Sequence, residues 1–176
     1  TITVANTNDA LTISSTAVTS ATEDAGYTYT VTTADVDVDD TSTLTGTTVP
    51  SWLTFTAATG VLAGTPVNAD VGTHSVVITA TDGDATVTDS FTITVANTND
   101  ALTISSTAVT AATEDAGYTY TVTTADVDVD DTSTLTGTTV PSWLTFTAAT
   151  GVLAGTPVNA DVGDHAVVIT ATDGDA

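Results

Sequence analysis

The chain contains no lysine, arginine, cysteine or methionine. Without basic side chains it has no means of releasing counterions from phosphates, so we expect no nucleic-acid binding and no attraction to an anionic membrane surface. Without cysteine, its stability does not come from disulfides. No apolar run approaches the roughly 20 residues of a membrane-spanning helix, so we expect no direct membrane insertion. What remains is a formal net charge of −22 with no basic side chain except two histidines.

Threonine, alanine and valine dominate what is present, and hydrophobic residues make up 41% of the chain. This is too apolar for a disordered acidic tail. Branched side chains fit a pleated sheet and lose little rotamer freedom there, so the composition predicts an all-β protein. A net charge this large opposes the compact state, and a counter-ion from outside would relieve the repulsion.

The sequence is built from two copies of one repeat. Residues 1–85 match residues 92–176 except at three pairs of positions, namely Ser20 and Ala111, Thr73 and Asp164, and Ser75 and Ala166. The offset of 91 residues is the size of a small domain and far exceeds the periods of solenoid proteins. We therefore expect two tandem domains in which both copies do the same job.

The phase of the repeat sets the expected domain boundaries at residues 1–97 and 98–176. Residues 1–8 then correspond to the last strand and linker of a preceding repeat, and the second repeat lacks its own last strand. This phase favours a segment of a longer array. The alternative is a subunit whose incomplete last domain accepts a strand from a neighbouring chain.

Turn signals and alternating hydrophobicity predict seven strands in each repeat. Seven short strands in about 90 residues are typical of an immunoglobulin-like Greek-key β-sandwich. We expect Trp52 and Phe55 in its core, and His74 and His165 in packing roles. In the first repeat the predicted strands cover residues 10–19, 27–34, 42–47, 51–55, 61–64, 74–81 and 85–96.

The acidic residues fall almost entirely in the loops, which gather at the two ends of such a sandwich. One end carries Glu23, Asp24, Asp70 and the linker Asn97–Asp100, whereas the other carries Asp35, Asp37, Asp39, Asp40, Asp82 and Asp84. Opposite ends of consecutive repeats are expected to meet. Carboxylate, amide and carbonyl oxygens without nitrogen or sulfur ligands favour Ca²⁺, which takes six to eight oxygens, over zinc.

Each repeat also resembles a cadherin-type domain, in the bacterial cadherin-like form found as tandem repeats of large surface adhesins and RTX-type repeat proteins. The likeness covers essentially the whole repeat. Glu23 matches an acidic residue near the first strands, and "PSWLTFTAATGVLAGTP" at 50–66 resembles the Ig signature of the bacterial form. The cadherin linker, DxD and AxD motifs resemble "ANTNDA" at 96–101, "DVD" at 126–128 and "ATD" at 171–173.

Two departures affect the ligand count. "VNADVG" at 67–72 replaces the cadherin DRE motif and leaves Asp70 as a stand-in, and Asn97 replaces the first linker aspartate. The resemblance implies one to three Ca²⁺ at each junction between repeats. The expected ligands are Glu23, Asp70, Asn97, Asn99, Asp100, Asp126, Asp128 and Asp173 at the complete junction, Asn6, Asn8, Asp9, Asp35, Asp37 and Asp82 in a partial N-terminal site, and Glu114 and Asp161 in a partial C-terminal site.

The sequence thus predicts a calcium-binding structural repeat of a secreted or cell-surface adhesin or fibre, with neighbouring repeats as partners. Its expected role is that of an extender or cell-adhesion stalk made rigid by Ca²⁺. Three alternatives remain: a fibre subunit that assembles by strand donation or repeat–repeat contacts, homophilic contacts made by the repeats themselves, and a solvated acidic surface that binds no metal. Paired carboxylates also occur in glycoside hydrolases. Since no aromatic sugar platform accompanies them, we expect no enzyme activity.

Overall fold

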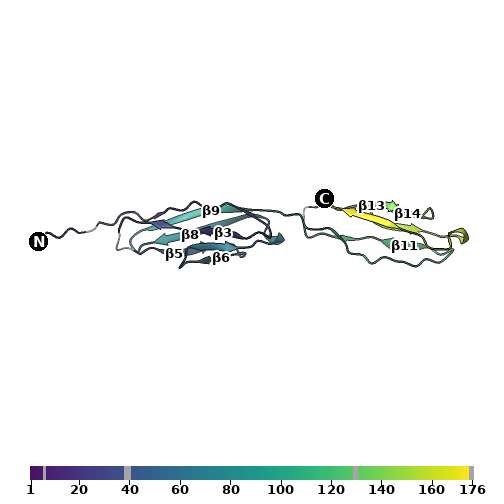
Figure 1. Ribbon diagram of the computed structural model, residues 1–176, viewed down its shortest axis with the longest axis horizontal. Coiled ribbons are helices and arrows are strands. Elements are labelled where there is room, and N and C mark those ends of the chain that lie inside the picture. The colour runs from purple at the N-terminus through teal and green to yellow at the C-terminus, as the bar shows by residue number, and fades with distance from the viewer. Residues whose placement is uncertain (6, 38–40, 129–130, 175–176) are drawn as a thin grey trace. The chain divides into compact units, whose positions relative to one another are not determined.

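The computed structural model describes residues 1–5, 7–37, 41–128 and 131–174. It is all-β, and the chain divides into two compact units, Thr1–Thr98 and Asn99–Ala176, called unit 1 and unit 2 below (Figure 1). Each unit is described by itself. The all-β class and the Ig-like sandwich predicted from the sequence are confirmed.

Unit 1 consists of two main sheets and a short strand pair. The larger sheet has the strand order β2-β9-β8-β5, the second has the order β3-β7-β6, and β1 pairs with β4. The connection between β7 and β8 contains a short 3₁₀ helix, η1. The bounds are β1 (Thr12–Ile13), β2 (Ser20–Thr22), β3 (Tyr27–Thr30), β4 (Thr33–Ala34), β5 (Thr43–Thr48), β6 (Leu53–Thr56), β7 (Val61–Gly64), η1 (Asn68–Asp70), β8 (Gly72–Thr81) and β9 (Thr86–Ala96).

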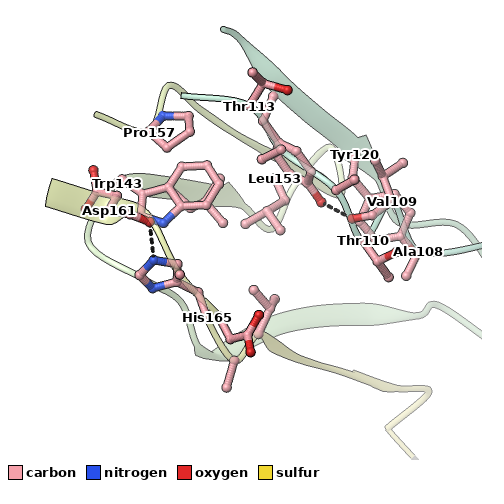
Figure 2. A pocket seen from close by; sticks show the side chains of 18 of the residues that line it. Ala108, Val109, Thr110, Thr113, Tyr120, Trp143, Leu153, Pro157, Asp161 and His165 are labelled. Atoms are coloured by element: carbon pink, nitrogen blue, oxygen red, sulfur yellow. Dashed lines mark hydrogen bonds between the residues drawn. The ribbon is translucent and has the colours of Figure 1, made fainter. Parts of the chain in front are cut away.

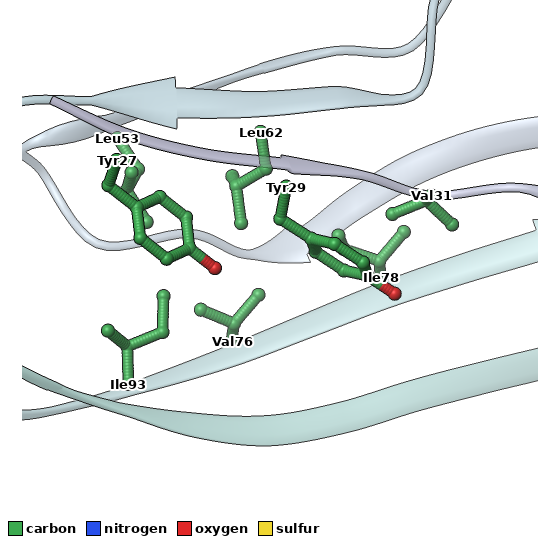
Figure 3. Packing of buried hydrophobic residues seen from close by; sticks show 8 residues of the cluster. All are labelled: Tyr27, Tyr29, Val31, Leu53, Leu62, Val76, Ile78 and Ile93. Atoms are coloured by element: carbon green, nitrogen blue, oxygen red, sulfur yellow. The ribbon is translucent and has the colours of Figure 1, made fainter. Parts of the chain in front are cut away.

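The core of unit 1 lies between the two main sheets. Alternate residues of each strand point inward, and these are the tyrosine, valine, leucine and isoleucine positions of the pattern. The buried cluster consists of Tyr27, Tyr29, Val31, Leu53, Leu62, Val76, Ile78 and Ile93 (Figure 3). Trp52 and Phe55, which are expected in the core from the sequence, are partly buried and pack against this cluster.

The "AATG" turn between β6 and β7 depends on Gly60. Its backbone has φ +70°, a left-handed conformation that glycine adopts without steric cost. A Cβ atom at this position would lie 2.3 Å from the carbonyl oxygen of Val31. The carbonyl of Gly60 accepts a 2.8 Å hydrogen bond from the N–H of Val31, so the turn is tied to the end of β3.

Unit 2 repeats this arrangement with fewer strands. Its sheets have the orders β11-β15-β14, β13-β16 and β10-β12. The 176 residues contain no counterpart of β9, and within the described residues neither β2 nor the first half of β8 has a strand counterpart. The bounds are β10 (Thr103–Ile104), β11 (Tyr118–Thr121), β12 (Thr124–Ala125), β13 (Thr134–Thr139), β14 (Leu144–Thr147), β15 (Val152–Gly155), η2 (Asn159–Asp161) and β16 (Val168–Thr172).

Two of the seven strands predicted for unit 1 are not continuous strands in the structure, so these two predictions are wrong. The segment 10–19 contributes only β1, because the chain then crosses to the other sheet, where β2 runs parallel to β9. The segment 27–34 is divided into β3 and β4. At this break the N–H of Thr32 donates to the hydroxyl of Ser15 at 3.0 Å, so a side chain replaces the ladder bond between strands.

Candidate metal-binding loops

The loop that follows β4 holds two aspartates in a fixed arrangement. Asp37 is only 8% exposed, and its backbone N–H donates to Oδ1 of Asp35 at 3.0 Å. Oδ2 of Asp37 accepts a 2.6 Å hydrogen bond from the backbone N–H of Asp9. This bond attaches the chain segment before β1 to the acidic loop. Of the predicted partial N-terminal site, the structure therefore brings Asp9, Asp35 and Asp37 together.

The β8–β9 turn brings a further carboxylate to the same loop. Oδ1 of Asp82 accepts hydrogen bonds from the backbone N–H groups of Ala85 (2.6 Å) and Asp84 (2.9 Å). The Ala85 N–H bond is the largest influence that lowers the pKa of Asp82, and it outweighs the opposing effect of burial. Asp82 therefore stays ionised below the pH at which an ordinary aspartate is protonated. Its side chain lies beside that of Asp35.

Neighbouring carboxylates repel, and those of Asp35 and Asp82 have an additional cost. The Oδ2 atom of each is buried and has no hydrogen-bond partner among the described residues. Removing a charged oxygen from water without giving it a partner is unfavourable. A cation bound at these oxygens would remove this cost.

Unit 2 reproduces the same geometry with its own residues. The N–H of Asp100 donates to Oδ2 of Asp128 at 2.6 Å, and the N–H of Asp128 donates to Oδ1 of Asp126 at 3.2 Å. Asp128 is 4% exposed, and the Oδ2 atom of Asp126 is buried without a hydrogen bond within the described residues. Asp173 also makes an interaction within the structure. The recurrence shows that the repeated sequence specifies the arrangement locally, within one unit.

The opposite end of unit 1 contains the buried Glu23, which is 3% exposed. Its Oε2 accepts the backbone N–H of Thr98 at 3.1 Å, and its carbonyl accepts the hydroxyl of Thr98 at 3.3 Å. Both bonds hold the chain that leaves β9 against the β2–β3 turn. In unit 2 the corresponding Glu114 is exposed.

The remaining predicted ligands make local hydrogen bonds, are exposed, or lie outside the described residues. Oδ2 of Asp70 accepts the N–H of Val67 at 3.0 Å and thereby closes η1, and Asp161 does the same with Val158 in η2. Asn8, Asn97 and Asn99 are exposed. Asn6 lies outside the described residues, as do Asp39, Asp40, Asp130 and Asp175.

No three His, Asp or Glu side chains of the described part of the chain converge closely enough to hold a metal ion. Each unit taken by itself thus presents partial ligand sets. His74 lies beside the short helix η1. Its Nε2 is 2.6 Å from the carbonyl oxygen of Asp70, and its ring packs edge-on against Trp52. This is the packing role predicted from the sequence.

Sequence reasoning missed the backbone donors of this region. The N–H groups of Asp9, Asp100 and Thr98 each bind a carboxylate that lies at least 28 residues away in the chain. The available signal is the linker sequence "NTND", whose side chains are predicted as ligands and whose backbone N–H groups also bind carboxylates. The metal ligands that the linker and the loops offer are carboxylate and amide oxygens with a net negative charge, which suits a hard divalent cation.

The fold and these acidic ends define a protein of tandem immunoglobulin-like repeats. More particularly, the chain belongs to the family described as Putative Ig domain, whose sequence model matches residues 9–96 and 101–176. The two matches correspond to two tandem copies of one domain.

Solved structures confirm the cadherin-like fold. The human protocadherin-24 EC1-2 structure is 16% identical, with a TM-score of 0.52 and coverage of 94% of both chains. The protocadherin gammaB7 EC3-6 cis-dimer structure is 13% identical, with a TM-score of 0.53 over 93% of this chain and 47% of that one. At these identities the likeness shows the fold alone.

An endo-fucoidan hydrolase of glycoside hydrolase family 107 is 27% identical over 94% of this chain. The chain spans only 27% of that enzyme, the TM-score is 0.44, and nothing about activity follows from the match. A search of curated proteins gives no match. Within the described residues, no helix has the length and apolar character needed to cross a membrane.

Proposed function

We propose that this chain is a calcium-binding structural repeat of a secreted or cell-surface protein, in which Ca²⁺ joins consecutive units into an extender or stalk. One observation carries the proposal. In both units the acidic loop after β4 or β12 contains a carboxylate oxygen, of Asp35 or Asp126, that is buried without a hydrogen-bond partner among the described residues. A positive charge beside such an oxygen would offset the cost of burying it, and the chain has no basic side chain to supply one except two histidines.

The proposed ligands come from both ends of the repeat. The partial sets of the individual units account for the lack of a closed cluster among the described residues, because each unit supplies only some of the oxygens that Ca²⁺ needs. At the junction they are Glu23, Asp70, Asn97, Asn99, Asp100, Asp126, Asp128 and Asp173.

The chain's own hydrogen bonds prepare these residues for binding. The Asp100 N–H bond to Asp128 fixes the linker to the acidic loop of unit 2, and the Thr98 bonds to Glu23 fix the same linker to the end of unit 1. Calcium, when bound, supplies the positive charge that the loops lack. Without it, the repulsion among the carboxylates opposes a stiff linker.

The location follows from the affinity expected of such sites. Extracellular calcium modules bind with dissociation constants of roughly 0.1–1 mM, because their loops are adjustable and exposed at the surface. Sites of this kind are filled at the millimolar Ca²⁺ of the extracellular medium and are empty at the much lower concentration inside a cell. The proposed stalk would therefore become stiff only after export.

The test is to titrate Ca²⁺ into the chelator-treated chain while recording the melting temperature and the maximum dimension by small-angle X-ray scattering. We expect both to rise, because the ion removes carboxylate repulsion in each unit and at the linker. Calorimetry should count one to three ions for the complete junction, in addition to any held by the partial sites.

The matched variants are Asp126→Asn with Asp128→Asn, and the control Asp164→Thr. Asn keeps the shape and an acceptor oxygen, but removes the charge that Ca²⁺ needs. Asp164 is exposed and does not belong to the junction ligands, and threonine is the residue at the corresponding position of unit 1. The double variant should lose most of the calcium-induced change and the control should retain it. If millimolar Ca²⁺ changes neither the melting temperature nor the maximum dimension of the original chain, the proposal is wrong.

A further inference from the structure

Two neighbouring edge strands of each unit have no strand beside them. In unit 1, β5 forms one end of the larger sheet and β6 forms one end of the second sheet, and among the described residues neither pairs with a strand on its outer side. In unit 2 the same holds for β13 and β14. An edge strand presents free backbone N–H and C=O groups, to which a further strand can bind.

The sequence of these edges is free of charge. Residues 41–69, which include β5, β6 and β7, contain no acidic or basic residue, and residues 132–160 of unit 2 are identical to them. They are the two longest uncharged stretches of a chain whose formal net charge is −22. Two copies of this chain repel each other least where such stretches meet.

The two edges of unit 1 differ in how well they are protected from pairing. Strand β5 has an irregular register between Gly46 and Thr48, and a bulge of this kind twists an edge away from a new partner. Strand β6 pairs with β7 in an unbroken register and contains no proline and no charged residue. The usual devices that protect an edge are thus absent from β6 and from its identical counterpart β14.

The backbone of β6 directs Phe55 to the outer side of the sheet. The N–H of Leu53 donates to the carbonyl of Pro50 at 3.0 Å, so it points away from β7. Residues two positions apart in an antiparallel strand direct their backbone groups to the same side. The N–H and C=O of Phe55 therefore also point outward, where they can bind another strand.

Strand β6 is held in place by the core behind it. Trp52, the residue before it, packs edge-on against Tyr27 and His74, with ring centroids 5.7 Å and 5.8 Å apart. In unit 2, Trp143 packs in the same way against His165, with ring centroids 6.0 Å apart (Figure 2). A strand that is already ordered loses little conformational freedom when it pairs.

An apolar cleft lies between the two edges. In unit 1 a Cβ atom added to Gly46 would lie 3.3 Å from that of Phe55, and in unit 2 Gly137 and Phe146 give the same distance, so the two edges are equally close in both units. The cleft of unit 2 has a volume of about 500 Å³, and its walls include Leu135, Val140, Pro141, Leu144 and Phe146. Pairing along the edge would cover part of this apolar surface.

We propose that this edge binds a second copy of the chain, with β6, or the identical β14, pairing antiparallel with the same strand of the other copy. Identical antiparallel strands pair around a two-fold axis, so both copies contribute the same residues. The outward backbone groups of Phe55 place it opposite Phe55 of the second copy, with Thr54 opposite Thr56. A second copy fits because its edge is equally uncharged, whereas a basic partner would be attracted to the acidic loops.

The expected association is weak. A four-residue strand covers much less than the roughly 1,200 Å² of a standard interface, so we expect a dissociation constant of about 0.1–1 mM. Repulsion between two chains of charge −22 opposes the contact further, and 0.5 M sodium chloride screens this repulsion. The measurement is made in this salt with chelator present, so its result does not depend on the proposed calcium sites.

Sedimentation equilibrium between 20 µM and 2 mM tests the proposal, and we expect the average mass to rise with concentration. In the edge variant, lysine replaces the exposed threonines of both edge strands. Lysines that face each other across the pair repel, so association should weaken by about tenfold or more. This loss should occur although added lysines reduce the overall negative charge. The substitutions are Thr54→Lys, Thr56→Lys, Thr145→Lys and Thr147→Lys.

The matched control places the same charges at the other end of the same sheet. Thr28 and Thr54 flank Ala63 in one row of the sheet, and Thr30 and Thr56 flank Val61 in another. The control should associate at least as strongly as the original chain, with unchanged circular dichroism in both variants. An original chain that stays monomeric up to 2 mM, or equal association of the two variants, would overturn the proposal. The control substitutions are Thr28→Lys, Thr30→Lys, Thr119→Lys and Thr121→Lys.

Introduced thiols test the register, because the chain contains no cysteine of its own. A mixture of one chain with Thr54→Cys and another with Thr56→Cys should form a mixed disulfide under mild oxidation, since opposed residues of antiparallel strands have Cβ atoms about 4.5–5.5 Å apart. A mixture of Thr28→Cys and Thr30→Cys chains is the control and should cross-link at least tenfold more slowly. Equal rates in the two mixtures would show that β6 is not the contact.

Discussion

Asp89 lies in the middle of strand β9, in contrast to the acidic residues of the loops. Its Oδ2 accepts a 3.0 Å hydrogen bond from the hydroxyl of Tyr29, and this hydroxyl also contacts that of Ser15 at 2.9 Å. Burial, together with the neighbouring Asp89 carboxylate, raises the pKa of Tyr29 above its usual value, while Ser15 acts in the opposite direction. Asp89 alternates in register with the inward-facing Ile93 and Val95 of β9, and its partner Tyr29 belongs to the other main sheet.

Tyr27 is the residue whose ionisation depends most on the fold. Burial, reinforced by Tyr29 and Asp89, raises its pKa to about 12. A tyrosine in an unfolded chain ionises near pH 10. Since the folded pKa is the higher one, the contribution of neutral Tyr27 to stability is complete below about pH 10 and is lost as the pH rises towards 12.

The raised pKa of Tyr27 predicts how unit 1 unfolds at alkaline pH. We expect unit 1 to lose stability between about pH 10 and 12, with tyrosinate absorbance and the loss of β-sheet circular dichroism changing together. The variant Tyr27→Phe should show a weaker pH dependence in this window, although it loses the hydrogen bond from the Tyr27 hydroxyl to the Val18 carbonyl. An unchanged pH dependence in the variant would contradict this assignment.

At the scale of elements, the sequence predicts strands well where one sheet holds a whole segment. Strands β5, β6, β7, β8 and β9 all coincide closely with predicted segments, because their alternation and flanking turns agree. The predictions fail where a segment changes sheets, as at β1 and β2, since residue alternation carries no information about which partner a strand chooses. The sequence pattern also predicts no helix at the position of η1.

The arrangement of the acidic loops is likewise predictable from the sequence only in part. The sequence predicts that Asp35, Asp37 and Asp82 lie together, because the order of strands places their loops at one end. It does not predict that Asp9 donates its N–H to Asp37. That bond depends on the path of the chain before β1, where no periodic pattern exists.

The two units differ in how much core they bury, and this has an expected thermodynamic effect. Among the described residues, unit 2 leaves Val167 partly exposed and buries fewer core residues than unit 1. Apolar burial contributes about 25 cal/mol per Å², so we expect unit 2 to unfold at a lower temperature than unit 1. The chain should melt in two steps.

The two tryptophans allow each step to be assigned, since Trp52 lies in unit 1 and Trp143 in unit 2. In the variant Trp52→Phe the fluorescence reports unit 2 and should change in the first transition. In Trp143→Phe it reports unit 1 and should change in the second. A single transition with the same midpoint in both variants would show that the two units unfold together.

At the scale of the whole molecule, charge dominates. The formal net charge of −22 comes from 22 acidic side chains with no lysine or arginine between them. Their mutual repulsion is relieved by unfolding, which spreads the charges apart. Dissolved salt therefore affects this protein more than one with balanced charges.

We predict that sodium chloride raises the melting temperature when divalent ions are removed by chelator. Between 10 mM and 500 mM salt, a gain on the order of 1 kcal/mol would shift each transition by about 4–8 °C. Chloride is preferred to sulfate here because sulfate also stabilises proteins by exclusion from their surface. A melting temperature that is constant or falls over this range would show that repulsion is not what limits stability.

The parallel pairing of β2 with β9 has a mechanical consequence. Strand β9 leads to the point where the chain leaves unit 1, and β2 is joined to it by hydrogen bonds such as Thr94 N–H to Thr19 O (3.0 Å) and Glu23 N–H to Ala96 O (2.9 Å). When tension draws the two ends apart along the strands, parallel neighbours must slide past each other, so the bonds between them are loaded in shear and break together. An antiparallel hairpin pulled from its open end would instead unzip one bond at a time. A three-residue strand at the edge of the sheet thus acts as a clamp against stretching.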